Sequence, residues 1–265
     1  MAYPLALARL NDGAKRFVLG LQDLAYMTMR VIARLFYPPW YFRETLEQMH
    51  FIGVGSLGLI VLTGVFTGQA LALQFSYELG AFGSKDYLGT VMANAIIREL
   101  GPVLAALMVA ARVGAGITAE IGAMKTTNQI EALESFGIDP LKKLAVPRLV
   151  AMLLMVPMLT VVCDVISILG GWIIAGFIAH VSTTIYWAAV RDRLIFGNIF
   201  VGVVKPFIFA TIVAMIAFQN GFAVTGGTKG VGRYTTRSVM ISSISILFGD
   251  FFMTKVLFSM LGWKF

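Results

Sequence analysis

Charged residues are scarce in this chain of 265 residues, because Asp, Glu, Lys and Arg together make up only 13% of it. A soluble domain carries about 25% of these residues. The chain therefore has too little charge to cover a compact globule with solvated side chains. This scarcity excludes a cytosolic enzyme and a nucleic-acid-binding module, and the 58% share of apolar residues indicates an integral membrane protein.

Cysteine and histidine are almost absent, since Cys163, His50 and His180 are the whole set. One cysteine cannot form an intrachain disulfide or a cysteine-based zinc site. Two histidines cannot build a histidine-rich metal centre. We therefore expect this chain to bind no metal ion and no cofactor of its own.

The sequence also lacks the motifs of ATP hydrolysis and of intramembrane proteolysis. It contains no Gly-x-x-x-x-Gly-Lys-Ser/Thr, and the glycine-containing segment 227–230 does not have that spacing. It contains no His-Glu-x-x-His either. We expect that the chain is not an enzyme, and that any ATP driving it is hydrolysed on another polypeptide.

Long apolar runs are what the sequence has instead. A membrane-spanning helix needs about 20 mostly apolar residues. Five runs meet this requirement, at about 51–74, 90–118, 146–180, 197–222 and 237–262. We interpret residues 1–265 as a single all-α membrane domain, and the odd number of spans places the two termini on opposite sides.

Positive charge is distributed unequally between the two sides. The segment before the first span and the connections after the second and fourth spans hold most of it, as Arg9, Lys15, Arg16, Arg30, Arg34, Arg43, Lys125, Lys142, Lys143, Arg148, Lys229, Arg233 and Arg237. The other connections hold only Lys85, Arg191 and Arg193. Because cytoplasmic loops are enriched in Lys and Arg, this predicts a cytoplasmic N-terminus and a periplasmic C-terminus.

The N-terminal segment, about 5–36, is predicted to form an amphipathic helix. Apolar or small side chains recur there at helical spacing, at Leu10, Ala14, Phe17, Leu21, Leu24, Thr28, Val31 and Leu35. Charged residues fall on another face, at Arg16, Asp23, Arg30 and Arg34. The helix either lies in the membrane interface or packs against the cytoplasmic side of the bundle, and in both cases it forms an elbow into the first span.

Small residues inside the spans predict close helix packing. Gly64 and Gly68 are four residues apart in the first span, and Gly170 and Gly171 are adjacent in the third. Such residues allow two transmembrane helices to approach closely, either within one chain or across a dimer.

Ionisable side chains inside the predicted spans need an explanation, because each costs about 2.5–3.5 kcal/mol or more in hydrocarbon. Arg98, Glu99 and Lys205 are each expected about 10–15 Å below the outer surface, with Asp250 somewhat deeper. These four residues either form ion pairs that lock the bundle or line a polar pocket where a cation meets an anionic headgroup. Asp164, which has no obvious partner, is interpreted as structural.

The connection between the second and third spans predicts a docking element. Residues 129–136 have helix-forming composition, Gly137 fits a helix C-terminus and Pro140 fits a stop. The coupling helix is expected over about 120–138, on the cytoplasmic side, where a short helix can dock into a groove of a partner. Glu131, Ala132 and Gly137, with Pro147 further on, are similar to the coupling loop of ABC importer permeases.

The longer segment 98–140, which reads RELGPVLAALMVAARVGAGITAEIGAMKTTNQIEALESFGIDP, resembles the MlaE family of ABC permeases, which serve lipid transport systems that contain MCE proteins. The resemblance covers nearly the whole chain and includes GGTKGVGRYTTRSV at 226–239. It implies a homodimer with an outward-facing cavity for phospholipid, lined in part by Arg98, Glu99, Lys205 and Asp250. The residues that it implies for coupling to the ATPase are Glu120, Lys125, Glu131, Glu134 and Gly137.

The resemblance also implies partners and a role. An MlaF-type ATPase would bind the coupling helices, an MlaB-type STAS protein would bind the ATPase, and a hexamer of MlaD-type MCE proteins would cap the periplasmic side. The complex would move phospholipid between the inner membrane of a Gram-negative bacterium and the MCE protein, and so support outer-membrane lipid asymmetry.

Two other functions remain open from the residues alone. An ion-coupled secondary carrier could use Glu99, Asp164 and Asp250 as proton sites, although such carriers usually have more spans and inverted repeats. A membrane scaffold could instead anchor peripheral subunits without transporting anything.

Overall fold

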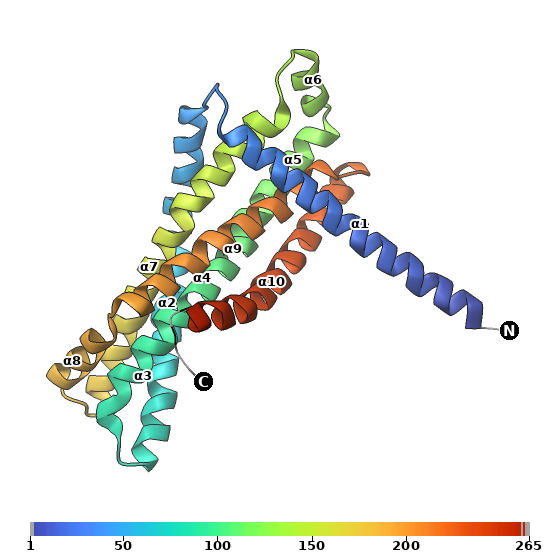
Figure 1. The fold of residues 1–265 in the computed structure, drawn as a ribbon. Coiled ribbons are helices and arrows are strands. Elements are labelled where there is room, and N and C mark those ends of the chain that lie inside the picture. The colour runs from blue at the N-terminus through green and yellow to red at the C-terminus, as the bar shows by residue number, and fades with distance from the viewer. Residues whose placement is uncertain (1–2, 261, 263–265) are drawn as a thin grey trace.

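A computed structural model describes the backbone of residues 3–260 and 262, and their side chains except those of residues 3–14, 16, 17 and 21. Regular structure within the described residues is entirely helical (Figure 1). The α-helices are α1 Tyr3–Leu35, α2 Phe42–Ala81, α3 Leu88–Ala95, α4 Gly101–Val109, α5 Ala115–Thr126, α6 Gln129–Ser135, α7 Val146–Phe177, α8 Thr183–Arg193, α9 Phe196–Phe222 and α10 Gly227–Met260. A 3-10 turn at Lys85–Tyr87 precedes α3, and π-helical turns at Ile96–Leu100, Ala110–Gly114 and Leu141–Ala145 join α3 to α4, α4 to α5 and the α6 connection to α7.

Five helical runs are long and apolar enough to cross a membrane, which confirms the all-α class and the number of spans. They are Phe42–Ala81, Lys85–Thr126, Leu141–Phe177, Phe196–Phe222 and Gly227–Met260. Most are longer than the sequence predicted, since the first has 40 residues and therefore a length of about 60 Å. A bilayer core is only about 30 Å thick, so hydropathy marks the part in hydrocarbon and misses the helical turns that continue beyond it.

The predicted boundaries near the coupling helix are wrong in two places. The expected helix over 120–138 is two helices, because α5 ends at Thr126 and Asn128 has a left-handed φ of 57° before α6 begins. Asn tolerates this conformation better than most residues, so the break falls there. Pro140 does not end a helix but precedes the π-helical turn that opens the third span, where a proline without an N–H fits the first turn.

The connection after the third span contains a helix that the sequence did not indicate. The third span ends at Phe177 rather than near residue 180, and α8 follows at Thr183–Arg193. Tyr186 of α8 is fully buried, and its hydroxyl donates to the carbonyl of Ile168 at 3.0 Å. This hydrogen bond fixes α8 against α7 at one end of the bundle.

Helices α2 and α7 share the most extensive helix–helix contact in the described structure, along a stripe of small residues. A Cβ atom at Gly64 would lie 3.1 Å from the carbonyl oxygen of Cys163, and one at Gly170 would lie 2.7 Å from that of Val65. A Cβ atom at Gly68 would overlap the Ser167 carbonyl. Lipid is as apolar as a leucine side chain, so close backbone approach of this kind supplies the attraction between membrane helices. The predicted glycine packing is confirmed within the chain.

Helix α1 packs against one end of the bundle and extends away from it toward the N-terminus (Figure 1). Val31 is fully buried, and Gln219 of α9 donates to the Gly20 carbonyl at 3.1 Å. Leu24 of the predicted apolar stripe also packs on the core, while the side chains of Leu10, Ala14, Phe17 and Leu21 lie outside the described residues. The bundle contact is therefore observed, and the interfacial location of α1 remains a prediction.

We expect Gly68→Ala to destabilise the protein and Gly58→Ala to leave it unchanged or stabilise it. Alanine is favoured over glycine in a helix by about 1 kcal/mol, and a Cβ atom at Gly58 meets nothing within 4 Å. At Gly68 the same methyl group overlaps α7, and overpacking costs about 1–3 kcal/mol. Thermal unfolding in detergent, followed by tryptophan fluorescence, measures the difference, and equal melting temperatures of the two variants would contradict the packing argument.

Candidate functional site

The Lys205 ammonium group is at the centre of a polar network that three helical runs share. Its Nζ atom donates to the Arg98 carbonyl oxygen at 2.8 Å, to Glu99 Oε2 at 2.6 Å and to Thr254 Oγ1 at 2.8 Å. Asp250 Oδ1 lies 2.9 Å away and forms an ion pair with it. The Lys205 side chain is 0% exposed, so these groups replace its hydration completely.

One proline and one glycine explain why the chain brings these groups together. Pro102 has no N–H, so it cannot donate to the carbonyl of Arg98 four residues earlier, and the Lys205 ammonium takes that place. Gly202, one turn before Lys205, lets α9 approach the π-helical turn Ile96–Leu100 closely, since a Cβ atom there would lie 2.6 Å from the Ile97 carbonyl. π-Helical turns of this kind occur frequently at functional sites.

Thr254 connects the cation to the acidic residues of the network. Its hydroxyl accepts from Lys205 and lies 3.1 Å and 3.2 Å from the two Glu99 carboxylate oxygens, to which it donates. The three ammonium hydrogens are used by Arg98, Glu99 and Thr254, so Asp250 contributes electrostatic attraction without a hydrogen bond of good geometry. One fully buried cation thus holds two carboxylates from different helices.

Arg98 extends the network toward the end of the bundle that contains α8. Its Nε atom donates to Asn198 Oδ1 at 2.8 Å, and its guanidinium group lies 5.5 Å from the centre of the Phe258 ring. The Asn198 amide in turn donates to the Arg193 carbonyl at 2.6 Å and to Asn94 Oδ1 at 3.3 Å. Hydrogen bonds therefore run continuously from Arg193 to Thr254 through three spans.

The four residues that the sequence placed at one depth do lie together, and internal ion pairing accounts for three of them. Glu99, Lys205 and Asp250 pair directly, and Arg98 adjoins them through its carbonyl group. A contact between any of these four residues and a lipid headgroup remains a prediction.

Asp164 packs against Gly101, and its Oδ1 atom is buried without a hydrogen-bond partner among the described residues.

Arg112 is a further charge inside a span that the sequence interpretation missed. It lies in the π-helical turn Ala110–Gly114, and its Nη1 atom donates to Ser56 Oγ at 2.9 Å and to the Phe51 carbonyl at 3.2 Å. Gly55 leaves room for the guanidinium group, which lies 5.1 Å from the centre of the Phe51 ring. The criterion that selected Arg98, a charge in an apolar run, would have found it.

The predicted coupling residues lie around α6, which projects at one end of the molecule (Figure 1). Lys125 forms an ion pair with Glu131, and Glu120 forms one with Arg148 at 2.8 Å. Because the Lys125 ammonium group bonds the Glu131 carboxylate, the pKa of Glu131 lies below its ordinary value and the group is ionised at neutral pH. Glu134 is exposed.

Gly137 ends α6 as the sequence predicted. Its φ is +72°, its N–H donates to the Glu134 carbonyl at 2.9 Å, and the next N–H, of Ile138, donates to the Leu133 carbonyl at 2.9 Å. This pair of bonds is the Schellman arrangement, which favours glycine at the left-handed position. It leaves Phe136 at the tip of α6, 81% exposed, a feature that the sequence interpretation did not select.

Other side chains of α6 hold this segment to the bundle. Ile130 is buried in the main apolar core and Leu133 packs against that core. The Lys125–Glu131 pair ties α6 to α5, and an ion pair between Arg34 and Asp139 ties the following connection to α1. The arrangement is a supported helix with an exposed aromatic ring, that of Phe136, and an exposed carboxylate, that of Glu134.

Comparisons with known proteins agree that the chain is similar to membrane permeases. Residues 45–256 match a family model described as "Permease MlaE". A probable ABC transporter permease of Rickettsia typhi is 36% identical over 92% of this chain and 94% of its own length. The intermembrane phospholipid transport system permease protein MlaE of Haemophilus influenzae is 36% identical over 82% and 84%, and the chloroplastic protein TRIGALACTOSYLDIACYLGLYCEROL 1 of Arabidopsis thaliana is 32% identical over 88% and 67%.

We expect Lys205→Met to destabilise the fold strongly, because it leaves the Glu99 and Asp250 carboxylates without their cation. Removing one partner of a buried ion pair costs about 3–5 kcal/mol. The triple variant that adds Glu99→Gln and Asp250→Asn removes all of these charges and should recover most of the loss. Thermal unfolding in detergent measures both, and a single variant as stable as the wild type, or a triple variant no better than the single one, would contradict the role of Lys205.

Proposed function

The chain belongs to the MlaE permease family, and from this premise we propose that it is the membrane-spanning subunit of an ABC transporter for phospholipid. In this proposal it moves phospholipid between a bacterial inner membrane and a periplasmic MCE protein and so supports outer-membrane lipid asymmetry. A separate ATPase supplies the energy.

The observation that carries this proposal is α6. A helix that extends beyond the spans, with a core-packed side and an exposed Phe136 at its tip, fits an element that inserts into a groove of a peripheral subunit. Exposed aromatic side chains on a rigid support are typical anchors of protein interfaces. Because the sequence has no phosphate-binding loop, energy from ATP would have to enter the chain through such a contact.

The proposed assembly follows the family. Two copies of the chain form a homodimer, each binds one MlaF-type ATPase through α6, an MlaB-type STAS protein binds the ATPase, and an MlaD-type MCE hexamer caps the other side. The distribution of Lys and Arg supports a cytoplasmic N-terminus and α6, and a periplasmic C-terminus. Glu120 and Lys125 of α5 and Glu131 and Glu134 of α6 then lie toward the ATPase side.

The network around Lys205 supports a division of roles within the lipid pathway. Lys205 is enclosed, so in this conformation it positions Glu99 and Asp250 rather than contacting cargo. Arg98 is only partly buried, and a guanidinium group can bind a phosphate by two parallel hydrogen bonds. We assign the headgroup contact to Arg98, at the wall of a chamber between the two protomers.

The proposal is tested by lipid transfer from liposomes that contain the chain, its ATPase and the MCE acceptor. Transfer that requires ATP and a hydrolysis-competent ATPase supports it. Transfer driven by a pH gradient without ATP would instead favour an ion-coupled carrier, and assembly of the subunits without any transfer would favour a scaffold.

We expect Phe136→Ser to weaken ATPase binding by about tenfold or more, because truncating an aromatic anchor costs about 2 kcal/mol. Phe82→Ser is the matched control, since Phe82 is 80% exposed in the connection after α2 and lies far from α6 in sequence. Co-purification and titration of the ATPase measure the effect.

A charge exchange, Lys125→Glu with Glu131→Lys, separates two roles of Glu131 in the same assay. If Glu131 only supports α6 through the ion pair, the exchange preserves ATPase binding. If Glu131 contacts the ATPase directly, the exchange weakens ATPase binding.

Equal ATPase affinity for the wild type and Phe136→Ser would contradict docking through α6.

We expect Arg98→Gln to lower ATP-driven lipid transfer at least tenfold while leaving ATPase binding unchanged, because the neutral amide loses the charge-assisted bonds to phosphate, worth about 1.5–3 kcal/mol. Arg191→Gln removes an equal charge from the exposed surface of α8 and should change transfer little. Transfer at the wild-type rate by an assembled Arg98→Gln complex would remove the headgroup assignment.

A further inference from the structure

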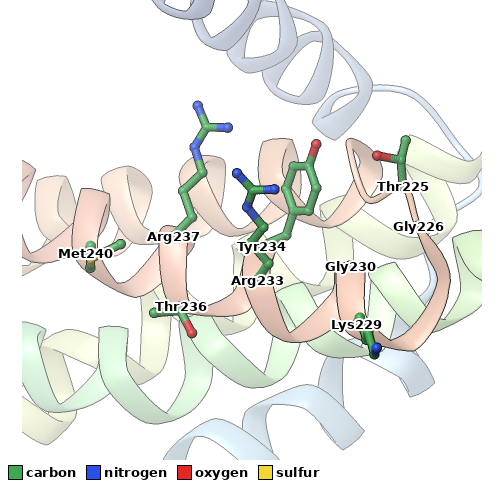
Figure 2. Close-up of a pocket in the computed structure, with 9 residues that line it drawn as sticks. All are labelled: Thr225, Gly226, Lys229, Gly230, Arg233, Tyr234, Thr236, Arg237 and Met240. Atoms are coloured by element: carbon green, nitrogen blue, oxygen red, sulfur yellow. The ribbon is translucent and has the colours of Figure 1, made fainter.

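The first turns of α10 line a large cavity that no function has yet been given. Its volume is about 860 Å³, which falls within the range of small-molecule sites. Three cations line it, Lys229, Arg233 and Arg237, together with Tyr234 and Met240 (Figure 2). The helical segment 227–240 contains no acidic residue.

The cations of this cavity are not neutralised by the rest of the described structure. Among the side chains that the structure describes, no ion pair involves Lys229, Arg233 or Arg237, and all three side chains are exposed. Arg233 and Arg237 are four residues apart on one helix, a spacing at which like charges destabilise each other. An anion between them would relieve this repulsion.

Figure 2 shows how these side chains point. Arg233, Tyr234 and Arg237 extend to one side of α10, and Lys229 extends to another. Helix α10 is anchored on its far side, where Ser238 is fully buried and its Oγ atom lies 2.9 Å from Thr118 Oγ1 of α5. The arginine side is therefore held outward by a packed helix rather than by a loop.

An apolar strip continues from the arginines along the same face of α10. At steps of three and four residues after Arg237 come Met240, Ile244, Leu247 and Phe251, which are 56%, 68%, 57% and 66% exposed. This spacing keeps all of them on one side of the helix. Two cations followed by an exposed apolar strip match the order of groups in a phospholipid, a charged head and then acyl chains.

The length of α10 is compatible with arginines at headgroup level. Its 34 residues span about 51 Å, whereas the bilayer core is about 30 Å thick and each headgroup layer adds roughly 5–8 Å. If the hydrocarbon begins at Met240, Arg237 lies about 4–5 Å and Arg233 about 10 Å beyond it, within or just past that layer. Lys229 lies about 16 Å beyond and outside it.

From this arrangement we infer that Arg233 and Arg237 bind the phosphate group of an anionic glycerophospholipid, whose acyl chain lies along Met240 and Ile244. The site is at the end of the bundle where α10 packs on α5, and it is separate from the network around Lys205. The inference does not need the chain to transport lipid, because it concerns resident binding in the leaflet on that side.

The test uses the full-length protein in detergent, with bound lipid counted by native mass spectrometry. Phosphatidylglycerol and phosphatidylcholine are titrated in parallel, and we expect the wild type to retain the anionic lipid preferentially. The double variant Arg233→Gln/Arg237→Gln should bind phosphatidylglycerol roughly 30-fold less tightly, given the usual contribution of each basic residue near anionic lipid. Arg43→Gln/Arg191→Gln removes the same charge from exposed positions on α2 and α8 and should change binding less than twofold.

Several results would overturn the inference. Equal loss in both double variants would mean diffuse charge attraction, and no preference of the wild type for phosphatidylglycerol would mean no anionic headgroup site. Displacement of the lipid by glycerol 3-phosphate at equal concentration would identify a site for soluble phosphate. A shift from dimer to monomer in Arg233→Gln/Arg237→Gln, with lipid retention unchanged, would assign this face to contact between copies. Because no ATPase is present, failure here leaves the transport proposal standing, and failure of ATP-driven transfer leaves this site standing.

Discussion

A bilayer offers no water to a buried ammonium group or to an unpaired carbonyl, so the chain itself must satisfy both. At Lys205 a single contact satisfies both a buried ammonium group and an unpaired carbonyl. Pro102 leaves the Arg98 carbonyl without its helical donor, and the ammonium group donates to it while pairing with Glu99 and Asp250. The approach of α9 at Gly202 and the hydroxyl of Thr254 on α10 both serve this arrangement. Three spans are thus fixed at one depth by a polar contact, where apolar side chains alone would give little orientation in lipid.

The remainder of the bundle depends on close backbone approach rather than on charge. The α2–α7 contact uses Gly64, Gly68 and Gly170. Such packing leaves no room for even one additional methyl group. The bundle therefore combines a tightly packed pair of helices with α10, the span with the smallest buried share, whose exposed face remains available to lipid or to a second copy.

Composition and spacing were sufficient for the class, the five spans and the glycine packing, because each depends on local sequence. The depth of Arg98, Glu99, Lys205 and Asp250 could be counted along the helices, so their meeting in one layer was predictable. Their pairing was not, since it depends on which helices are neighbours. The break at Asn128 was missed because no apolar pattern marks a left-handed residue. The helix α8 was missed because its sequence has no clear apolar repeat. The exposure of Phe136 depends on how Gly137 turns the chain, and depth counting cannot reveal that.

The second span joins the two polar regions of the molecule mechanically. Lys125 and Glu131 hold α6 at one end of the run Lys85–Thr126, and Arg98 and Glu99 lie roughly 40 Å from that end along the run. Between them the run is helical throughout but contains two π-helical turns, Ile96–Leu100 and Ala110–Gly114. Each turn contains an arginine whose side chain bonds a different span, Arg98 to α9 and Arg112 to α2. A movement of α6 along this run would therefore reach the Lys205 network through two points where the helix is already irregular and already attached to its neighbours.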